Sequence, residues 1–68
     1  MKFSVNGKPR ELPGQPTVGD YIRHLGVNPL AVAVELNGQI VKREQFDATP
    51  IPEEARLEVV RMMGGGSR

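Results

Sequence analysis

The sequence predicts a small α+β fold in which one main helix packs on one face of a mixed sheet of four to five strands. Short segments of alternating apolar and polar residues, typical of half-buried strands, occur at both ends and in the middle of the chain. Only one segment has helical spacing of its apolar residues, and two Asn-Gly pairs mark hairpin turns. Since one helix covers little more than one face of such a sheet, we expect two layers.

The first element is a predicted hairpin. Residues 1–5 alternate between apolar and polar side chains, which indicates a half-buried strand. Asn6 and Gly7 both accept positive φ and therefore favour a tight hairpin turn. Residues 8–12 form the returning strand, and Pro9 restricts that strand to an edge or a bulge because it cannot donate to a ladder.

The one predicted helix begins after Thr17, a favourable N-cap, and Asp20 stands where it completes a capping box. Its apolar face comprises Val18, Tyr21 or Ile22, and Leu25. Gly26 is expected to end the helix with a left-handed conformation, and Pro29 prevents the helix from resuming.

The second half of the chain is predicted to supply the remaining strands. Residues 31–36 form a β-rich strand, and the Asn-Gly pair at 37–38 turns it into the short strand 40–41. Residues 42–46 are expected to form an irregular or 3₁₀ turn that inserts Phe46 into the core.

The last predicted strand, Leu57 to Met63, places Leu57 on one face and leaves apolar surface near its end. A hairpin, a helix, a strand, a short strand and a final central strand follow the ubiquitin-like β-grasp topology. We therefore expect residues 1–63 to be a β-grasp domain and residues 64–68 to be a flexible glycine-rich tail.

The tail is the first candidate for a functional site. Gly64, Gly65 and Gly66 lack side chains, so they can thread a slot too narrow for any other residue and present a carboxylate inside a partner. Our hypothesis is that this carboxylate, or one made by trimming, is the reactive group. Glycine-serine segments are also typical of flexible spacers, so the tail alone leaves a linker as the alternative.

Composition excludes several classes of function. The chain has 68 residues and no cysteine, which argues against an iron–sulfur site, a redox dithiol and a cysteine-rich zinc site. Its 9 basic and 8 acidic residues are scattered, so no nucleic-acid footprint is present. His24 stands alone, and no metal site is predicted. No signal peptide or membrane-spanning run is apparent, so we expect a soluble, cytoplasmic protein that is monomeric alone.

A family resemblance adds to this interpretation. Residues 32–41, the pair Arg43-Glu44, the aromatic Phe46, and residues 57–61 followed by glycines resemble the ThiS family of thiamine-pathway sulfur carriers over nearly the whole chain. The resemblance implies a β-grasp fold. It also implies that a ubiquitin-activating-like adenylyltransferase uses ATP to adenylate the terminal glycine, and that a sulfur donor system, drawing on cysteine, converts the adenylate to a thiocarboxylate. Thiazole synthase would then place this sulfur in the thiazole of thiamine.

Carried over residue by residue, the resemblance makes Gly66 the residue that bears the adenylate and then the thiocarboxylate. Gly64 and Gly65 would enter the partner's active site. The candidates for docking to partners are Arg61, Met62 and Met63. The chain would be a protein cosubstrate, not an enzyme, with no bound cofactor of its own.

Three departures from the family pattern accompany the resemblance. Ser67 and Arg68 follow Gly66, so a Gly66 carboxylate requires their removal by a protease unless they are a cloning remnant. Lys42 stands where proline is common, and Phe46 where tryptophan is common. Residues 53–55, Glu-Glu-Ala, replace an acidic turn that usually contains glycine, which puts the geometry of that turn in question.

Two alternatives remain open from the sequence. The chain could carry sulfur for another pathway, such as molybdopterin, cysteine or tRNA thiolation, because the chemistry of the tail is shared. It could instead be a β-grasp binding module without a reactive tail.

Overall fold

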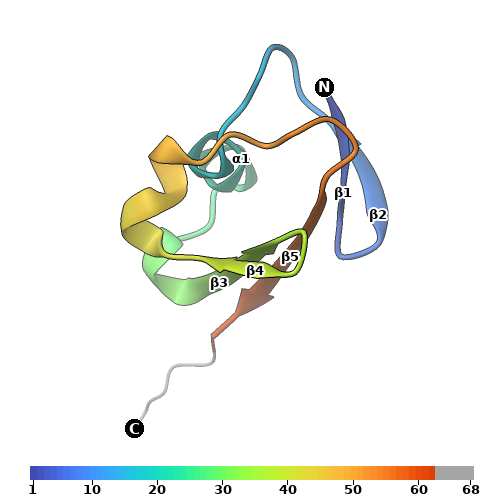
Figure 1. Cartoon of the computed structure of the whole chain (residues 1–68). Helices are drawn as coiled ribbons and strands as arrows, with labels where there is room; N and C mark the ends of the chain where they lie inside the picture. The colour runs from blue at the N-terminus through green and yellow to red at the C-terminus, as the bar shows by residue number, and fades with distance from the viewer. Residues whose placement is uncertain (63–68) are drawn as a thin grey trace, which may run out of the picture.

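The computed structural model describes residues 1–62, which form a five-stranded mixed sheet with helix α1 and the 3₁₀ turn η2 packed on one face (Figure 1). The strands are β1 (Lys2–Val5), β2 (Lys8–Glu11), β3 (Val32–Leu36), β4 (Gln39–Val41) and β5 (Arg56–Arg61). The helical elements are α1 (Val18–Leu25), η1 (Pro29–Ala31) and η2 (Arg43–Ala48). The predicted α+β class, with one main helix on one face, is confirmed.

The last strand in the sequence lies in the middle of the sheet, whose order is β2-β1-β5-β3-β4. β5 runs parallel to β1, with Ser4 opposite Arg56, and antiparallel to β3, with Leu36 opposite Leu57. The two hairpins β1–β2 and β3–β4 therefore become one sheet only through β5, which unites the N-terminal and middle parts of the chain (Figure 1).

Both Asn-Gly pairs form the predicted tight turns. Asn6 and Gly7 have φ of 53° and 82°, and Asn37 and Gly38 have φ of 51° and 86°, so both central residues of each turn are left-handed. Such turns match the twist of the strands that they join. Pro9 lies in β2, an edge strand, as its missing N–H requires.

Helix α1 has the predicted caps. Thr17 Oγ1 accepts from the Asp20 N–H at 3.0 Å, and Asp20 Oδ2 accepts from the Thr17 N–H at 2.9 Å. Gly26 ends the helix with φ of 74°. The assignment of Leu25 to the buried face was wrong, because its side chain is 42% exposed. The last turn of α1 carries Leu25 into the lining of a groove next to β2 and β5, beyond the close-packed part of the sheet.

The capping box makes stability depend on pH. The backbone N–H of Thr17, and then the Arg23 guanidinium, lower the pKa of Asp20 below its usual 3.8. A carboxyl whose pKa is lowered by folding stabilises the protein above its unfolded pKa, and this contribution disappears as the pH falls through the folded pKa. We expect Asp20→Asn to lower the unfolding temperature by several degrees at pH 7 and to have a shrinking effect below about pH 4.

Thermal unfolding of the wild type and the variant across this pH range measures the difference. Glu11→Gln, on the exposed edge strand, is the control and should show no such convergence at low pH. A gap between Asp20→Asn and wild type that stays constant down to pH 2 would contradict the electrostatic explanation.

The core lies between α1, η2 and the sheet. The most completely buried side chains are Val18, Ile22, Val34, Ile51 and Leu57. Phe46 from η2 is only 5% exposed, which confirms its predicted role as an anchor. Phe3 and Tyr21 pack edge to face with their ring centroids 5.4 Å apart.

The turn before β5 adopts an unusual conformation for its sequence. Glu54 has φ of 65°, a left-handed conformation that favours glycine, and its N–H donates to the Lys2 carbonyl at 2.7 Å. This result answers the question raised by residues 53–55, because the turn keeps a glycine-like conformation without the glycine.

Glu54→Gly should therefore raise the free energy of unfolding by about 0.5–1 kcal/mol, since relief of a left-handed penalty of about 1–2 kcal/mol exceeds the added flexibility of the unfolded chain. Denaturant unfolding measures the change. Glu53→Gly is the matched control, because φ is not positive there, and it should destabilise the protein. Destabilisation by both substitutions would contradict the assignment of strain to Glu54.

Candidate functional site at the end of β5

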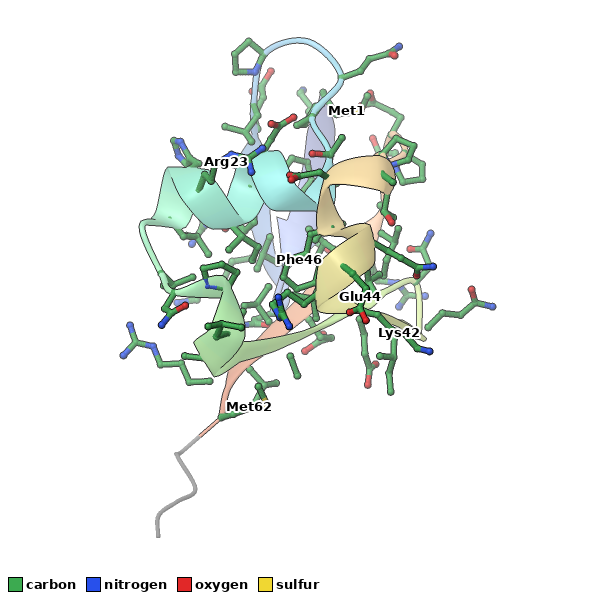
Figure 2. The ribbon with its side chains drawn as sticks, turned by 90° about the vertical axis from the view of Figure 1, so that its left-hand side faces the viewer. Met1, Arg23, Lys42, Glu44, Phe46 and Met62 are labelled. Atoms are coloured by element: carbon green, nitrogen blue, oxygen red, sulfur yellow. The ribbon has the colours of Figure 1, made fainter. Side chains whose placement is uncertain are left out.

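The predicted site residues follow directly from β5. The strand ends at Arg61, and the N–H of Met62 still donates to the Ala31 carbonyl at 2.8 Å. Met62 lies at the opposite end of the molecule from Met1 (Figure 2). The predicted roles of Met63, Gly64, Gly65 and Gly66, and the boundary between domain and tail, fall outside the described residues and stay predictions.

The last residues of β5 are held from both sides. On one side they pair with β3 through Val32 opposite Arg61. On the other side β1 ends at Val5, and the Asn6 side chain continues the pairing. Asn6 Nδ2 donates to the Val59 carbonyl at 3.0 Å, and the Val59 N–H donates to Asn6 Oδ1 at 2.9 Å. The chain therefore reaches Met62 from a fixed strand.

The docking candidates Arg61 and Met62 lie on opposite faces of the sheet. Successive side chains of a strand alternate between faces, and the buried Leu57 fixes which face packs against α1. Val59 and Arg61 share the face of Leu57, whereas Met62 lies on the outer face. Met62 follows the last residue of β5, however, and both docking candidates line one hollow beside Val27 and Ala31, so a single partner could contact both.

The outer face carries an apolar patch next to the end of β5. We call it the outer patch; it consists of Ile40, Val60 and Met62, which are 76%, 58% and 51% exposed, with Ala33 opposite Val60. Ile40 on β4 is separated from β5 by β3, whose Glu35 lies opposite it, so the three side chains share one face without forming a continuous apolar surface. Several exposed apolar side chains on one face favour contact with another protein. The sequence had indicated extra apolar surface near the end of this strand, at Val60, Met62 and Met63; Met63 lies outside the described residues.

Sequence reasoning missed Ile40, which it placed in a short apolar strand without choosing a face. Its alternation with Val41 was the available signal, because only one of two successive strand residues can face the core. In the structure Val41 is buried and Ile40 is exposed.

Two carboxylates lie among the side chains of the outer patch. Glu35 lies directly opposite Glu58 on one side and Ile40 on the other, and both glutamates are exposed. Among residues 1–62, the ion pairs join Arg23 to Asp20 and Asp47 only, so neither glutamate forms an ion pair there, and the basic residue on the same face of β5 is Arg56, two positions from Glu58. Like charges directly across two strands destabilise a sheet slightly, so their presence beside the patch favours a contact with a cationic group.

The remaining candidate residues give weaker evidence of a functional site. His24 stacks on Tyr21 with ring centroids 6.2 Å apart, and residues 1–62 contain no cluster of three His, Asp or Glu side chains able to hold a metal ion. Lys42 has φ of −72°, a value that proline would also adopt, so this departure from the family pattern leaves the backbone unchanged. Within the described chain, none of the helices combines the length and the apolar character that crossing a bilayer requires.

A helix on one face of a mixed sheet, with the last strand in its centre beside and parallel to the first, defines the ubiquitin-like β-grasp class and confirms the predicted topology. The chain belongs to the ThiS family, whose model matches residues 3–66. A crystal structure of the thiamine biosynthesis protein ThiS from Geobacter metallireducens is 39% identical, covers 97% of this chain and 100% of that one, and superposes with a TM-score of 0.82.

Two curated relatives are thiazole synthases. Those of Magnetococcus marinus and Paramagnetospirillum magneticum are each 36% identical to this chain, over 97% and 98% of its length. The chain spans only about a fifth of the length of these relatives, 20% and 21% respectively. Each of them therefore contains a ThiS-like segment within a much longer protein.

Proposed function

We propose that this chain is a sulfur carrier protein of thiamine biosynthesis, and that the carboxylate of Gly66 is its reactive group. The observation that carries the proposal is the extent of the family match, which runs to Gly66 and stops there. The fixed course of β5 up to Met62 supports it, because a carrier must deliver its end group in a defined direction. Cleavage of the bond between Gly66 and Ser67 would produce the carboxylate.

The chemistry explains why a second protein must act on the chain. A carboxylate is a poor acyl donor, because oxide is a poor leaving group. Attack of the Gly66 carboxylate on the α-phosphorus of ATP expels pyrophosphate and forms an acyl adenylate. A persulfide of the donor system then attacks the acyl carbon and expels AMP, which forms an acyl disulfide. A thiol of the donor system attacks the donor-side sulfur of this disulfide, forms a new disulfide with the donor and releases the thiocarboxylate. The adenylyltransferase supplies the ATP site, so this chain serves as a cosubstrate.

The outer patch is our proposed docking surface for the adenylyltransferase. Its exposed apolar side chains and its two glutamates, neither of which forms an ion pair within residues 1–62, fit a partner surface that combines apolar side chains with an arginine or lysine. For the next step, we propose thiazole synthase as the acceptor of the sulfur. The relatives in which a ThiS-like segment forms a fifth of a thiazole synthase support this choice.

Mass spectrometry tests the reactive group. A variant that ends at Gly66 is incubated with ATP, the adenylyltransferase and a sulfur donor, and should gain the mass difference between sulfur and oxygen. A variant lacking Gly66 and the full 68-residue chain are the controls, and neither should gain it. No gain in the first variant, or an equal gain without Gly66, would refute the proposal.

A pull-down tests the pathway. The variant ending at Gly66, immobilised through its N-terminal side, should retain thiazole synthase from a lysate. Recovery of the large subunit of molybdopterin synthase in its place would assign the carrier to a different sulfur pathway.

A further inference from the structure

A second surface lies on the face of the sheet that packs against α1, opposite the outer patch. It is a groove of about 420 Å³ between the end of the β1–β2 hairpin, the last turn of α1 and the last residues of β5. We call it the basic groove; its principal side chains are Lys8, Arg10, Leu25, Val27, Val59 and Arg61. A volume of this size accommodates several side chains of a bound ligand.

All the charged side chains that line the basic groove are positive. Lys8, Arg10 and Arg61 line it, and no acidic residue does. The register of the hairpin places Lys8 opposite Val5 and Arg10 opposite Phe3, so both cations share the face of buried core residues. Since the whole chain has a net charge of only +1, the groove is a local excess of positive charge.

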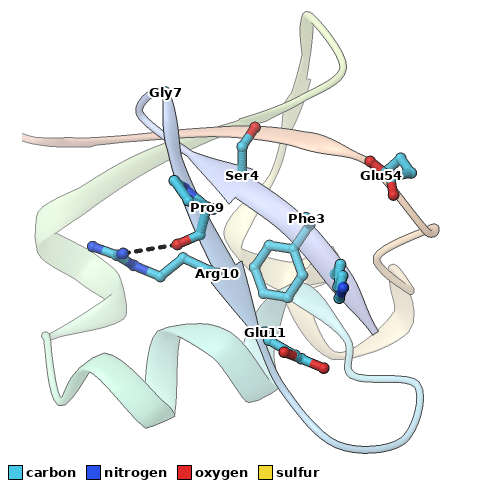
Figure 3. A pocket seen from close by; sticks show the side chains of 8 residues that line it. Phe3, Ser4, Gly7, Pro9, Arg10, Glu11 and Glu54 are labelled. Carbon is cyan, nitrogen blue, oxygen red and sulfur yellow. Dashed lines mark hydrogen bonds between the residues drawn. The ribbon is translucent and has the colours of Figure 1, made fainter.

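Figure 3 shows how Arg10 is directed. Its side chain extends away from Glu11 and Glu54, and Nη1 donates to the Pro9 carbonyl at 2.9 Å. This hydrogen bond uses one of five guanidinium N–H donors, so the others remain for a ligand.

The floor of the groove is apolar. Leu25 is 42% exposed although it belongs to the apolar face of α1, and the groove is the space that it faces. Val27 and Val59 are half-buried beside it. An apolar floor beneath a cationic rim suits a ligand that is itself both apolar and acidic.

Besides its cations and its apolar side chains, the groove offers main-chain hydrogen-bonding groups that are free within the described part of the chain. Val59 uses its N–H and carbonyl on this side of β5 for the Asn6 side chain. Residues 58, 60 and 62 direct their N–H and carbonyl groups toward β3, as the hydrogen bond from the Met62 N–H to the Ala31 carbonyl shows. The N–H and carbonyl of Arg61 therefore face the side that β1 has left, and no partner for them lies within residues 1–62. An extended peptide could pair with them as a further strand.

We propose that the basic groove binds an extended, acidic segment of a partner protein. Its carboxylates lie beside the three groove cations, its apolar side chains contact Leu25 and the valines, and its backbone pairs with Arg61. The inference does not depend on chemistry at Gly66, and it leaves the outer patch free for a different contact. A partner bound here could therefore remain attached while the outer patch docks on an enzyme.

The test is an NMR titration of the ¹⁵N-labelled chain with three blocked peptides of about eight residues, roughly 26 Å when extended. Pairs of glutamates alternate with pairs of valines in the first, pairs of lysines with pairs of valines in the second, and pairs of glutamates with pairs of serines in the third, so that each face of the extended peptide carries both residue types. The first should bind with a Kd at or below about 1 mM. It should shift the amides of Val27, Val59 and Arg61 and slow solvent exchange at Arg61.

Variants assign the binding to the groove. Arg61→Glu and Leu25→Ser should each raise the Kd of the glutamate–valine peptide at least about tenfold, equivalent to about 1.4 kcal/mol. Leu30→Ser is the matched control, because Leu30 is 62% exposed outside the groove, and it should change nothing. Equal binding of the lysine–valine peptide, shifts confined to the outer patch, or no binding at 1 mM would each overturn the proposal.

Discussion

Replacing Ile40 and Val60 together with lysine should lower the rate of adenylation at Gly66 at least about tenfold at subsaturating carrier concentration, with little change in folding. Both side chains are more than half exposed, so their replacement removes little from the core. Covering one such side chain in a docked complex contributes about 1.5–3 kcal/mol, and about 1.4 kcal/mol corresponds to a factor of ten. The loss should raise KM, since neither side chain takes part in the chemistry at the Gly66 carboxylate.

The comparison needs variants that keep the fold. Ile40→Lys places an ammonium opposite Glu35, which is a favourable cross-strand pair, so the unfolding temperature should stay near that of the wild type. Leu30→Lys is the matched control, because Leu30 is exposed in a hollow beside Ile22 and Phe46 on the other face of the sheet. An unchanged KM in the double variant, or an equal rise in the control, would show that the outer patch is not the docking surface.

The pair formed by Glu35 and Glu58 allows a second test of docking at the outer patch. Glu58→Gln removes a like-charge contact with Glu35 and should leave stability equal or slightly higher. If the partner places a cation against this pair, the variant should nevertheless raise KM, and the effect should weaken with added salt. Gain in stability together with loss of docking is the result that distinguishes a binding role from a structural one.

The parts of the fold that the sequence predicted correctly depend on neighbours in the chain. A capping box joins residues three apart, as Thr17 and Asp20 are, and an Asn-Gly turn specifies its own backbone angles. The edge position of Pro9 and the buried Phe46 follow from similarly local arguments. These signals were sufficient to assign the order of elements and, with the family resemblance, the topology.

The parts that the sequence missed depend on residues far apart in the chain. Leu25 has the spacing of a core residue, but a side chain in the last turn of a helix is buried only if the sheet extends beneath it. Ile40 became a site residue because β4 lies at an edge and turns this side chain outward. The link between Asn6 and Val59 spans 53 positions, and no local pattern in either segment indicates it.

Loss of the Asn6 side chain should be among the most destabilising single changes at an exposed position. Asn6→Gly keeps the left-handed backbone, with φ of 53°, but removes both side-chain bonds to Val59. We expect a loss of about 1–2 kcal/mol, because each such bond contributes about 0.5–1.5 kcal/mol. Asn6→Ala should cost about 1 kcal/mol more, since alanine is strained in this conformation. For a domain of this size, with a total stability of about 3–10 kcal/mol, either loss is large.

Asn37→Gly is the matched control for this prediction. Asn37 occupies the same position in the other hairpin turn, and its side chain makes a single bond, from the Arg56 N–H at 2.9 Å at the opposite end of β5. Asn37→Gly should lower the free energy of unfolding by about half as much as Asn6→Gly, because it removes one bond worth about 0.5–1.5 kcal/mol. Denaturant unfolding measures both values.

Hydrogen exchange shows which part of β5 each substitution destabilises. Asn6→Gly should accelerate exchange at the Val59 amide beyond the global change in stability, whereas Asn37→Gly should accelerate it at Arg56. Unchanged protection of Val59 in Asn6→Gly would mean that β3 alone holds the end of β5. Faster exchange would show that a turn residue near the N-terminus fixes the strand that leads to Gly66, so that loosening this turn should also raise the KM for adenylation.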